Sequence, residues 1–105
     1  MRLDTLAARS RHLALFERYG ALLTKHQQDV LELSLRSDWS LAEIADHQGT
    51  SRAAVHDIVK RSVDALEEYE RRLGLLAEGV KRRRKVASLE RELAGLKRRV
   101  AELEA

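Results

Sequence analysis

Residues 40–61, SLAEIADHQGTSRAAVHDIVKR, constrain the fold of this chain more than any other stretch. Ser40 followed by Glu43 forms a capping box, so we expect a helix to begin directly after the serine. Gly49 permits the left-handed backbone that ends a helix, and Ser51 is a residue type that caps the start of another. Two short helices joined by a glycine turn predict a helix-turn-helix, although an αα-corner that only packs would show the same pattern.

Both predicted helices carry apolar residues at helical spacing. These form an inner face, which comprises Leu41, Ile44 and Ala45 in the first helix and Val55, Ile58 and Val59 in the second. The second helix keeps a polar outer face, as does a helix that enters the major groove of DNA. The residues expected to meet nucleic acid are Ser51, Arg52, Ala53, His56, Asp57, Lys60 and Arg61.

Asp57 is unexpected on such a face because its carboxylate repels phosphate. It is compatible with DNA if it accepts a hydrogen bond from a cytosine amino group, or if it orients Arg61 four residues further along the helix.

The residues before the helix-turn-helix predict helices that support it. Thr24 and Gln27 form a second capping box, which predicts a helix from Lys25 to about Arg36. Residues 1–23 predict one helix, or two short ones broken near residues 9–11, because an apolar stripe recurs at Leu3, Leu6, Leu13, Phe16 and Leu23. Three aromatic residues are expected in or over the core rather than at a binding site, namely Phe16, Tyr19 and Trp39.

Beyond Arg61 the helical pattern continues, and Gly74 and Gly79 are expected to mark helix ends. The inner stripe comprises Val63, Leu66, Tyr69, Leu73 and Leu76. Carboxylates outside this stripe are interpreted as a solvated face, and they are Asp64, Glu67, Glu68 and Glu70.

The last segment has the most regular pattern in the chain. Apolar residues alternate steps of three and four, which is the heptad seam of a coiled coil, and they are Val86, Leu89, Leu93, Leu96, Val100 and Leu103. In this register the g and e positions of two parallel chains pair opposite charges, as Lys85 with Glu90, Glu92 with Lys97, and Arg99 with Glu104. We therefore expect a parallel homodimer; the alternative is a tail that folds back onto its own domain.

The net charge of +3 is unevenly distributed. Residues 1–80 carry 11 Lys and Arg against 13 Asp and Glu, whereas residues 81–105 carry 9 against 4. A protein that holds duplex DNA usually has a basic face on the reading domain itself. Here the densest basic run lies in the tail, where it is either a solvated linker or a nucleic-acid contact, and it comprises Lys81, Arg82, Arg83, Arg84 and Lys85.

Several function classes find no support in the sequence. The chain has no cysteine, no apolar stretch of the roughly 18 residues that span a bilayer, and no signal-peptide pattern, so we expect a cytoplasmic protein without membrane insertion. No nucleophile elbow, phosphate-binding glycine loop or metal-binding spacing occurs, so we expect neither an enzyme nor a metal or cofactor. The four histidines lie on different segments, at His12, His26, His47 and His56.

The stretch from Leu13 to Leu76 closely resembles the YlxM family of small bacterial helix-turn-helix proteins. The matching motifs are LFERYGALLT, the segment at Gln27, SDWSLAEIA, TSRAAVHDIVKR and LEEYERRLGLL. More distantly, residues 27–60 are similar to region 4 of bacterial sigma factors, which reads the promoter −35 element. The chain has His56 where the family commonly has tyrosine, and the tail beyond Gly79 matches less well.

The resemblance implies a mainly helical, dimeric DNA-binding regulator linked to the signal recognition particle pathway. Carried over to this chain, the recognition helix covers Ser51, Arg52, Val55, Asp57, Lys60 and Arg61.

Together these features predict an all-α fold with a sigma region 4-like helix-turn-helix domain at residues 1–78. A basic linker and a C-terminal coiled-coil helix are expected at 79–105. The partner is expected to be nucleic acid, with DNA favoured over RNA. One alternative is an accessory protein that binds signal recognition particle RNA or its GTPase, and another is a dimeric scaffold with no nucleic-acid role.

Overall fold

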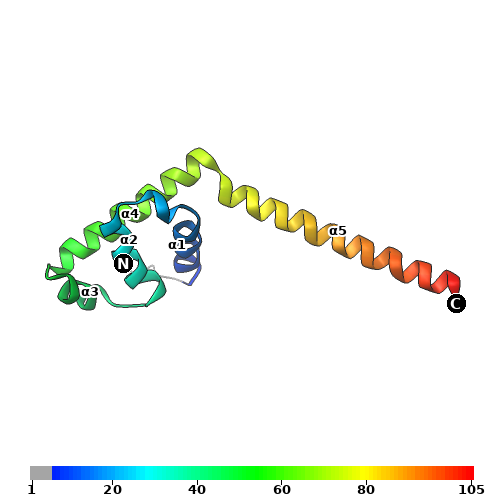
Figure 1. Cartoon of the computed structure of the whole chain (residues 1–105), viewed down its shortest axis with the longest axis horizontal. Coiled ribbons are helices and arrows are strands. Elements are labelled where there is room, and N and C mark those ends of the chain that lie inside the picture. The colour runs from blue at the N-terminus through cyan, green and yellow to red at the C-terminus, as the bar shows by residue number, and fades with distance from the viewer. Residues whose placement is uncertain (1–5) are drawn as a thin grey trace. The chain divides into compact units, whose positions relative to one another are not determined.

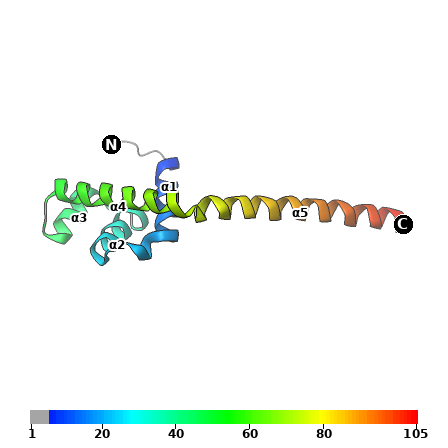
Figure 2. The same cartoon turned by 90° about the horizontal axis from the view of Figure 1, so that it is seen from above.

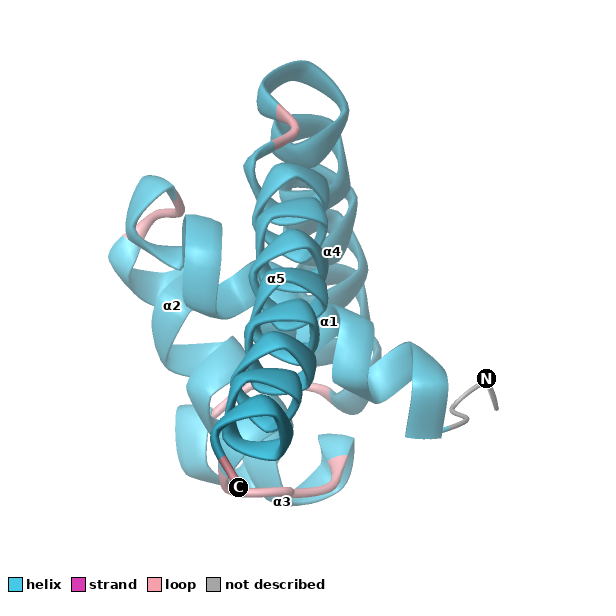
Figure 3. Cartoon of the chain, turned by 90° about the vertical axis from the view of Figure 1, so that its right-hand side faces the viewer, coloured by secondary structure: helices cyan, strands magenta, loops and turns pink. Residues whose placement is uncertain are grey.

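The structure is a computed structural model that describes residues 6–105, and every element within this range is a helix. The predicted all-α fold is confirmed. In chain order the elements are α1 (Leu6–Tyr19), the 3₁₀ turn η1 (Gly20–Leu22), α2 (Lys25–Leu31), the π-helical turn η2 (Glu32–Arg36), α3 (Leu41–Gln48), α4 (Arg52–Leu73) and α5 (Leu75–Glu104). The chain divides into two compact units, Met1–Gly74 and Leu75–Ala105. Figure 3 shows helices connected by short loops throughout the described part.

The predicted helix caps are confirmed. In the first capping box, the Thr24 hydroxyl accepts a hydrogen bond from the Gln27 amide at 3.2 Å, and the Gln27 side chain accepts one from the Thr24 amide at 3.0 Å. Ser40 and Glu43 form the second box in the same way, at 3.1 and 2.8 Å. Because both boxes satisfy backbone donors that a helix start leaves open, α2 and α3 begin where the sequence predicts.

The turn of the helix-turn-helix also has the predicted geometry. Gly49 adopts a left-handed conformation with φ of 70°, which ends α3. The Ser51 hydroxyl then accepts a hydrogen bond from the Ala54 amide at 3.1 Å and caps α4.

Of the two alternatives for the N-terminal region, the single helix is confirmed, because α1 continues through residues 9–11 without a break. Two other expectations need correction. Leu6 does not join the apolar stripe, because its side chain is 85% exposed, and Leu3 lies outside the described residues. The second helix is α-helical only to Leu31 and then widens into the π turn η2, in which the Ser37 amide donates to the Glu32 carbonyl at 3.1 Å.

The first unit is built around α4, which packs against α1, α2 and α3 (Figures 1 and 2). Phe16 and Tyr19 are buried, as predicted, and Trp39 packs against the core with its ring edge-on to His47. The buried apolar residues are Leu15, Phe16, Tyr19, Leu23, Val30, Leu31, Ile44, Ala45, Val55 and Leu66. The predicted inner faces of α3 and α4 therefore meet and hold the helix-turn-helix together.

The acidic cluster of α4 is not simply a solvated face. Arg11 of α1 donates two hydrogen bonds to the Glu67 carboxylate, at 2.8 and 2.6 Å, and the Tyr19 hydroxyl donates to Glu70 at 2.6 Å. The hydrogen bond from Arg11 lowers the pKa of Glu67, against a smaller effect of desolvation. These carboxylates fix α1 against α4.

Of the two glycines predicted to mark helix ends, one prediction is confirmed and the other is wrong. Gly74, with φ of 63°, ends α4, whereas Gly79 lies inside α5 and ends nothing. A glycine within a helix costs only about 1 kcal/mol relative to alanine, and good helix formers lie on both sides of Gly79, at residues 75–78 and 81–85. The expected basic linker is consequently helical, because residues 81–85 belong to α5. The predicted division after residue 78 stays a prediction, and the break between the helices falls at Gly74.

Candidate nucleic-acid interface

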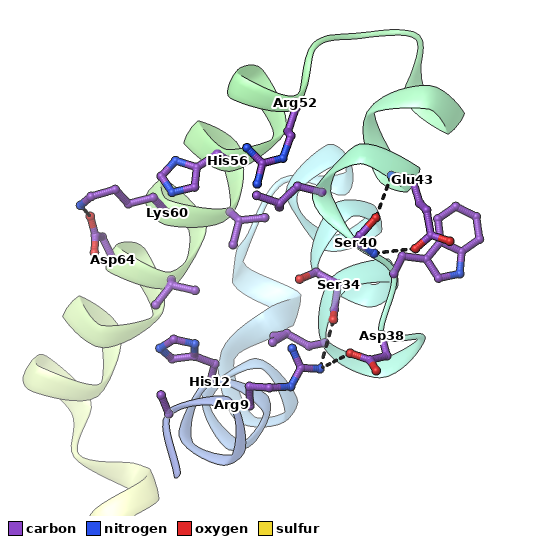
Figure 4. Close-up of a pocket in the computed structure, with 16 residues that line it drawn as sticks. Arg9, His12, Ser34, Asp38, Ser40, Glu43, Arg52, His56, Lys60 and Asp64 are labelled. Atoms are coloured by element: carbon purple, nitrogen blue, oxygen red, sulfur yellow. Dashed lines mark hydrogen bonds and ion pairs between the residues drawn. The ribbon is translucent and has the colours of Figure 1, made fainter. Parts of the chain in front are cut away.

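Three of the predicted contact residues lie along one side of α4. Arg52, His56 and Lys60 are spaced by four residues, so they share a face of the helix. Figure 4 shows this row beside an open groove, which α1, η2 and the start of α3 border on the other sides. The groove has a volume of about 990 Å³.

The opposite wall of the groove contains residues that sequence reasoning did not place there. His12 of α1 lines it, together with Arg9, which donates to the Ser34 carbonyl at 3.4 Å and pairs with Asp38 at 3.1 Å. Asp38 adopts a positive φ of 58°, a conformation that aspartate tolerates better than most residues. No local pattern relates α1 to this loop, because the two segments are distant in sequence. The apolar residues of the groove are Ala8, Leu35, Trp39, Leu41, Val59 and Val63.

A second row on α4 comprises Ala53, Asp57 and Arg61, all of them exposed. Arg61 pairs with Asp57 at 3.1 Å, which is one of the two roles that the sequence allowed for that carboxylate. Lys60 likewise pairs with Asp64 at 3.1 Å. Two of the three cations on the reading face are therefore neutralised within their own helix.

Arg52 differs from both of these cations. It is exposed, lies in the first turn of α4, and forms no salt bridge with any described residue. A free guanidinium at the start of this helix can donate to an acceptor outside the protein.

The remaining predicted contacts, Lys81 to Lys85, lie on α5 in the second unit and are exposed along the whole run. Arg82 pairs with Glu78 at 3.0 Å. The other four cations form no ion pair within the described part of the chain, and they are Lys81, Arg83, Arg84 and Lys85.

Other kinds of site receive no support within residues 6–105. No cluster of histidine and acidic side chains in this range could hold a metal ion. None of the helices described combines the length and apolar character needed to cross a membrane.

The fold and this interface define a small helix-turn-helix protein. Over residues 6–104 the chain matches the family described as "Putative helix-turn-helix protein, YlxM / p13 like", UPF0122, and it belongs to that family. The predicted membership is thus confirmed, and the match extends through the tail, beyond the stretch from Leu13 to Leu76.

Two similar proteins illustrate the relationship. UPF0122 protein STH1464 of Symbiobacterium thermophilum is 49% identical over 79 residues, which cover 75% of this chain and 74% of the relative. UPF0122 protein SpyM50882 of Streptococcus pyogenes serotype M5 is 51% identical over 69 residues, which cover 66% of this chain and 61% of the relative. The chain thus aligns with less than two thirds of the length of this streptococcal relative.

Proposed function

We propose that this protein is a regulator that binds duplex DNA through the start of α4. The observation that carries the proposal is Arg52, which is exposed, has no ion pair with any of residues 6–105 and lies at the N-terminal end of the second helix of a helix-turn-helix. Recognition helices present this end to base edges in the major groove. An arginine there can donate both hydrogen bonds that the guanine O6 and N7 atoms accept.

The other polar residues of α4 then position the helix on the DNA backbone. Lys60 and Arg61 exchange their partners Asp64 and Asp57 for phosphates at little cost, because exposed ion pairs are worth only about 0–1 kcal/mol. His56 faces the same groove as Arg52 and is available to a phosphate or a base (Figure 4). The Ser51 hydroxyl oxygen caps α4 as an acceptor, and its O–H group can still donate a hydrogen bond to a phosphate of the DNA backbone.

Dimerisation is part of the same proposal. The heptad seam of α5 is apolar and exposed, and opposite charges flank it on both sides in the parallel arrangement. Two copies joined through this seam would bring two α4 helices to one duplex, and helix-turn-helix dimers bind half-sites about one helical turn of DNA apart.

A second candidate follows from the distribution of charge. The helix-turn-helix unit has little free positive charge, whereas residues 81–85 carry four unpaired cations. The family resemblance implies a link to the signal recognition particle pathway, and an accessory role there would use these cations to bind its RNA. A helix cannot enter the narrow major groove of A-form RNA, so Arg52 would then contribute little.

Gel-shift titration against genomic DNA fragments tests the first candidate. We expect the full chain to retard a subset of fragments, and Arg52→Ala to weaken that binding by about fivefold to 150-fold, equivalent to about 1–3 kcal/mol. Arg18→Ala is the matched control, because Arg18 is also exposed and forms no salt bridge within the described part of the chain, but lies on α1. The absence of a retarded species at low salt, or equal losses in the two variants, would reject the proposal.

A further inference from the structure

The helix α5 continues without interruption from the basic run into the heptad seam (Figures 1 and 2). The sequence pattern alone allowed residues 81–85 to be a mobile linker. In the structure their orientation is instead fixed by the same helix that carries Val86 and Leu89. The heptad register can therefore be extended backwards through the run.

The extended register shows where the seam stops. Val86 occupies an a position of the heptad and Leu89 a d position, and these are the two core positions. Upstream of Val86, the next core positions are therefore Arg82 at d and Gly79 at a. Glycine provides no side chain to pack, and Arg82, which pairs with Glu78 of its own helix, places a polar group instead of an apolar one at a core position. Two α5 helices that pair from Val86 onwards are consequently not held together before it, and they diverge towards their N-terminal ends.

The diverging segments carry the free cations of the run. Because successive residues of a helix are rotated by about 100°, residues 81–85 surround their helix rather than marking one face of it. Four cations of each copy have no ion pair within the described part of their own chain, but in the dimer Lys85 pairs with Glu90 of the second copy. Lys81, Arg83 and Arg84 remain, so a dimer presents six free cations. A dimer of basic helices that separate ahead of a coiled coil is the arrangement in which zipper proteins hold the DNA major groove.

We propose that two copies of α5 form a basic fork that grips duplex DNA immediately ahead of the coiled coil. This inference rests on the proposed dimer and deepens the proposed DNA binding, because it adds a second contact that is independent of base reading by Arg52. Duplex DNA is the fitting partner because its major groove, about 12 Å wide, admits a helix. The fork supplies affinity without sequence preference, and α4 supplies the selectivity.

The salt dependence of DNA affinity tests the fork. Removal of two cations per chain with Arg83→Ser/Arg84→Ser removes four from the dimer and should reduce the slope of log K against log salt by about 3 to 4. The matched control Arg91→Ser/Arg98→Ser removes the same charge from two f positions of the coiled coil, which point away from the seam, and should change the slope by less than about 1. Equal changes in both variants would overturn the fork.

The same titration separates this inference from the proposed reading role of α4. Arg52→Ala should reduce the preference for the selected genomic fragment over a random duplex and change the slope by about 1 or less. The fork variant should weaken binding to both duplexes equally. If Arg52→Ala leaves the preference for the selected fragment unchanged while the fork variant reduces the salt slope, the reading role of α4 is rejected and the fork is supported. If Arg52→Ala reduces the preference while the fork variant leaves the slope unchanged, only the fork is rejected.

Helical continuity can be tested without a change of charge. Insertion of Gly-Ser-Gly between Lys85 and Val86 keeps every cation and the whole seam but disconnects their orientations. We expect at least about a tenfold loss of affinity for duplex DNA, with an unchanged dimer by light scattering. Unchanged affinity would show that the run acts as a flexible tether and would overturn the fork. Stronger binding to an A-form RNA duplex than to DNA by the parent chain would also overturn it.

Discussion

The two units of this protein use similar residues in different ways. In the helix-turn-helix unit, every described cation except Arg18 and Arg52 forms an ion pair, and three of these pairs join segments that are distant in sequence. In α5, Arg82 alone among the described cations has such a partner. Most cations of the first unit thus have a carboxylate partner in their own chain, whereas most of those in α5 have none within the described residues.

Apolar residues show the same contrast. The core leucines of the first unit, such as Leu15 and Leu66, are completely buried. The seam residues from Val86 to Val100 are 48–53% exposed, although their spacing is more regular than that of the core. A regular apolar stripe that its own unit leaves uncovered is most simply explained by a second copy of the same helix.

The largest expected effect comes from disruption of the seam. Leu89→Glu/Leu96→Glu places charges at two d positions and should lower DNA affinity by about a hundredfold, because both units then bind as single copies. Ala94→Glu/Ala101→Glu adds the same charge at two outward b positions and serves as the control. Fluorescence anisotropy with a labelled duplex measures both variants, and comparable losses would show that charge rather than dimerisation is responsible.

Replacing one glycine by alanine in each unit should change the stability of the two units in opposite directions. A Cβ atom at Gly20 would lie 2.8 Å from Cδ1 of the buried Phe16 ring, so Gly20→Ala should destabilise the first unit by about 1–3 kcal/mol. At Gly95 the nearest atom is an Arg98 nitrogen at 3.9 Å, so Gly95→Ala should stabilise α5 by up to about 1 kcal/mol. Urea unfolding measures both effects, with Trp39 fluorescence to follow the first unit and circular dichroism to follow total helix content. A Gly20→Ala variant as stable as the parent would contradict the close packing of Gly20 against Phe16.

A smaller effect should follow from the pair that joins α1 to α4. Because Arg11 lowers the pKa of Glu67 in the folded state, this carboxylate contributes stability above its unfolded pKa of about 4.3, and the contribution is lost as the pH falls through the folded value. Glu67→Gln should cost about 0.2–1 kcal/mol at neutral pH, and the difference from the parent should narrow below about pH 4.

Trp39 fluorescence during urea unfolding at several pH values measures this difference, with Glu102→Gln on α5 as the control. A deficit in Glu67→Gln that does not change with pH would assign the loss to packing rather than to charge.

Local signals in the sequence predicted much of the fold. The capping boxes, Gly49 and Ser51 act through residues within a few positions of one another, so their roles could be read directly from spacing. The inner faces of α3 and α4 followed from helical periodicity for the same reason. Gly79 was misinterpreted because a helix former on each side outweighs the modest cost of one glycine.

The parts that sequence reasoning missed depend on contacts between distant segments. Arg11 and Glu67 are 56 positions apart, and Arg9 and Ser34 are 25 apart, so no local pattern relates them. The π turn η2 has no sequence signature that we recognise. At the candidate interface, α4 was found from the sequence, whereas the groove wall formed by α1 became visible only in the fold (Figure 4).

The central claim is that the first unit is self-contained, whereas α5 is completed by a second copy of the chain. The mass of the protein in solution tests this claim most directly. Static light scattering at micromolar concentration should give about 24 kDa for the full chain, twice its mass of 12.0 kDa. Deletion of residues 86–105 should reduce the protein to a monomer while Trp39 still reports a folded first unit. A 12.0 kDa full chain, or a dimer that survives the deletion, would contradict the account.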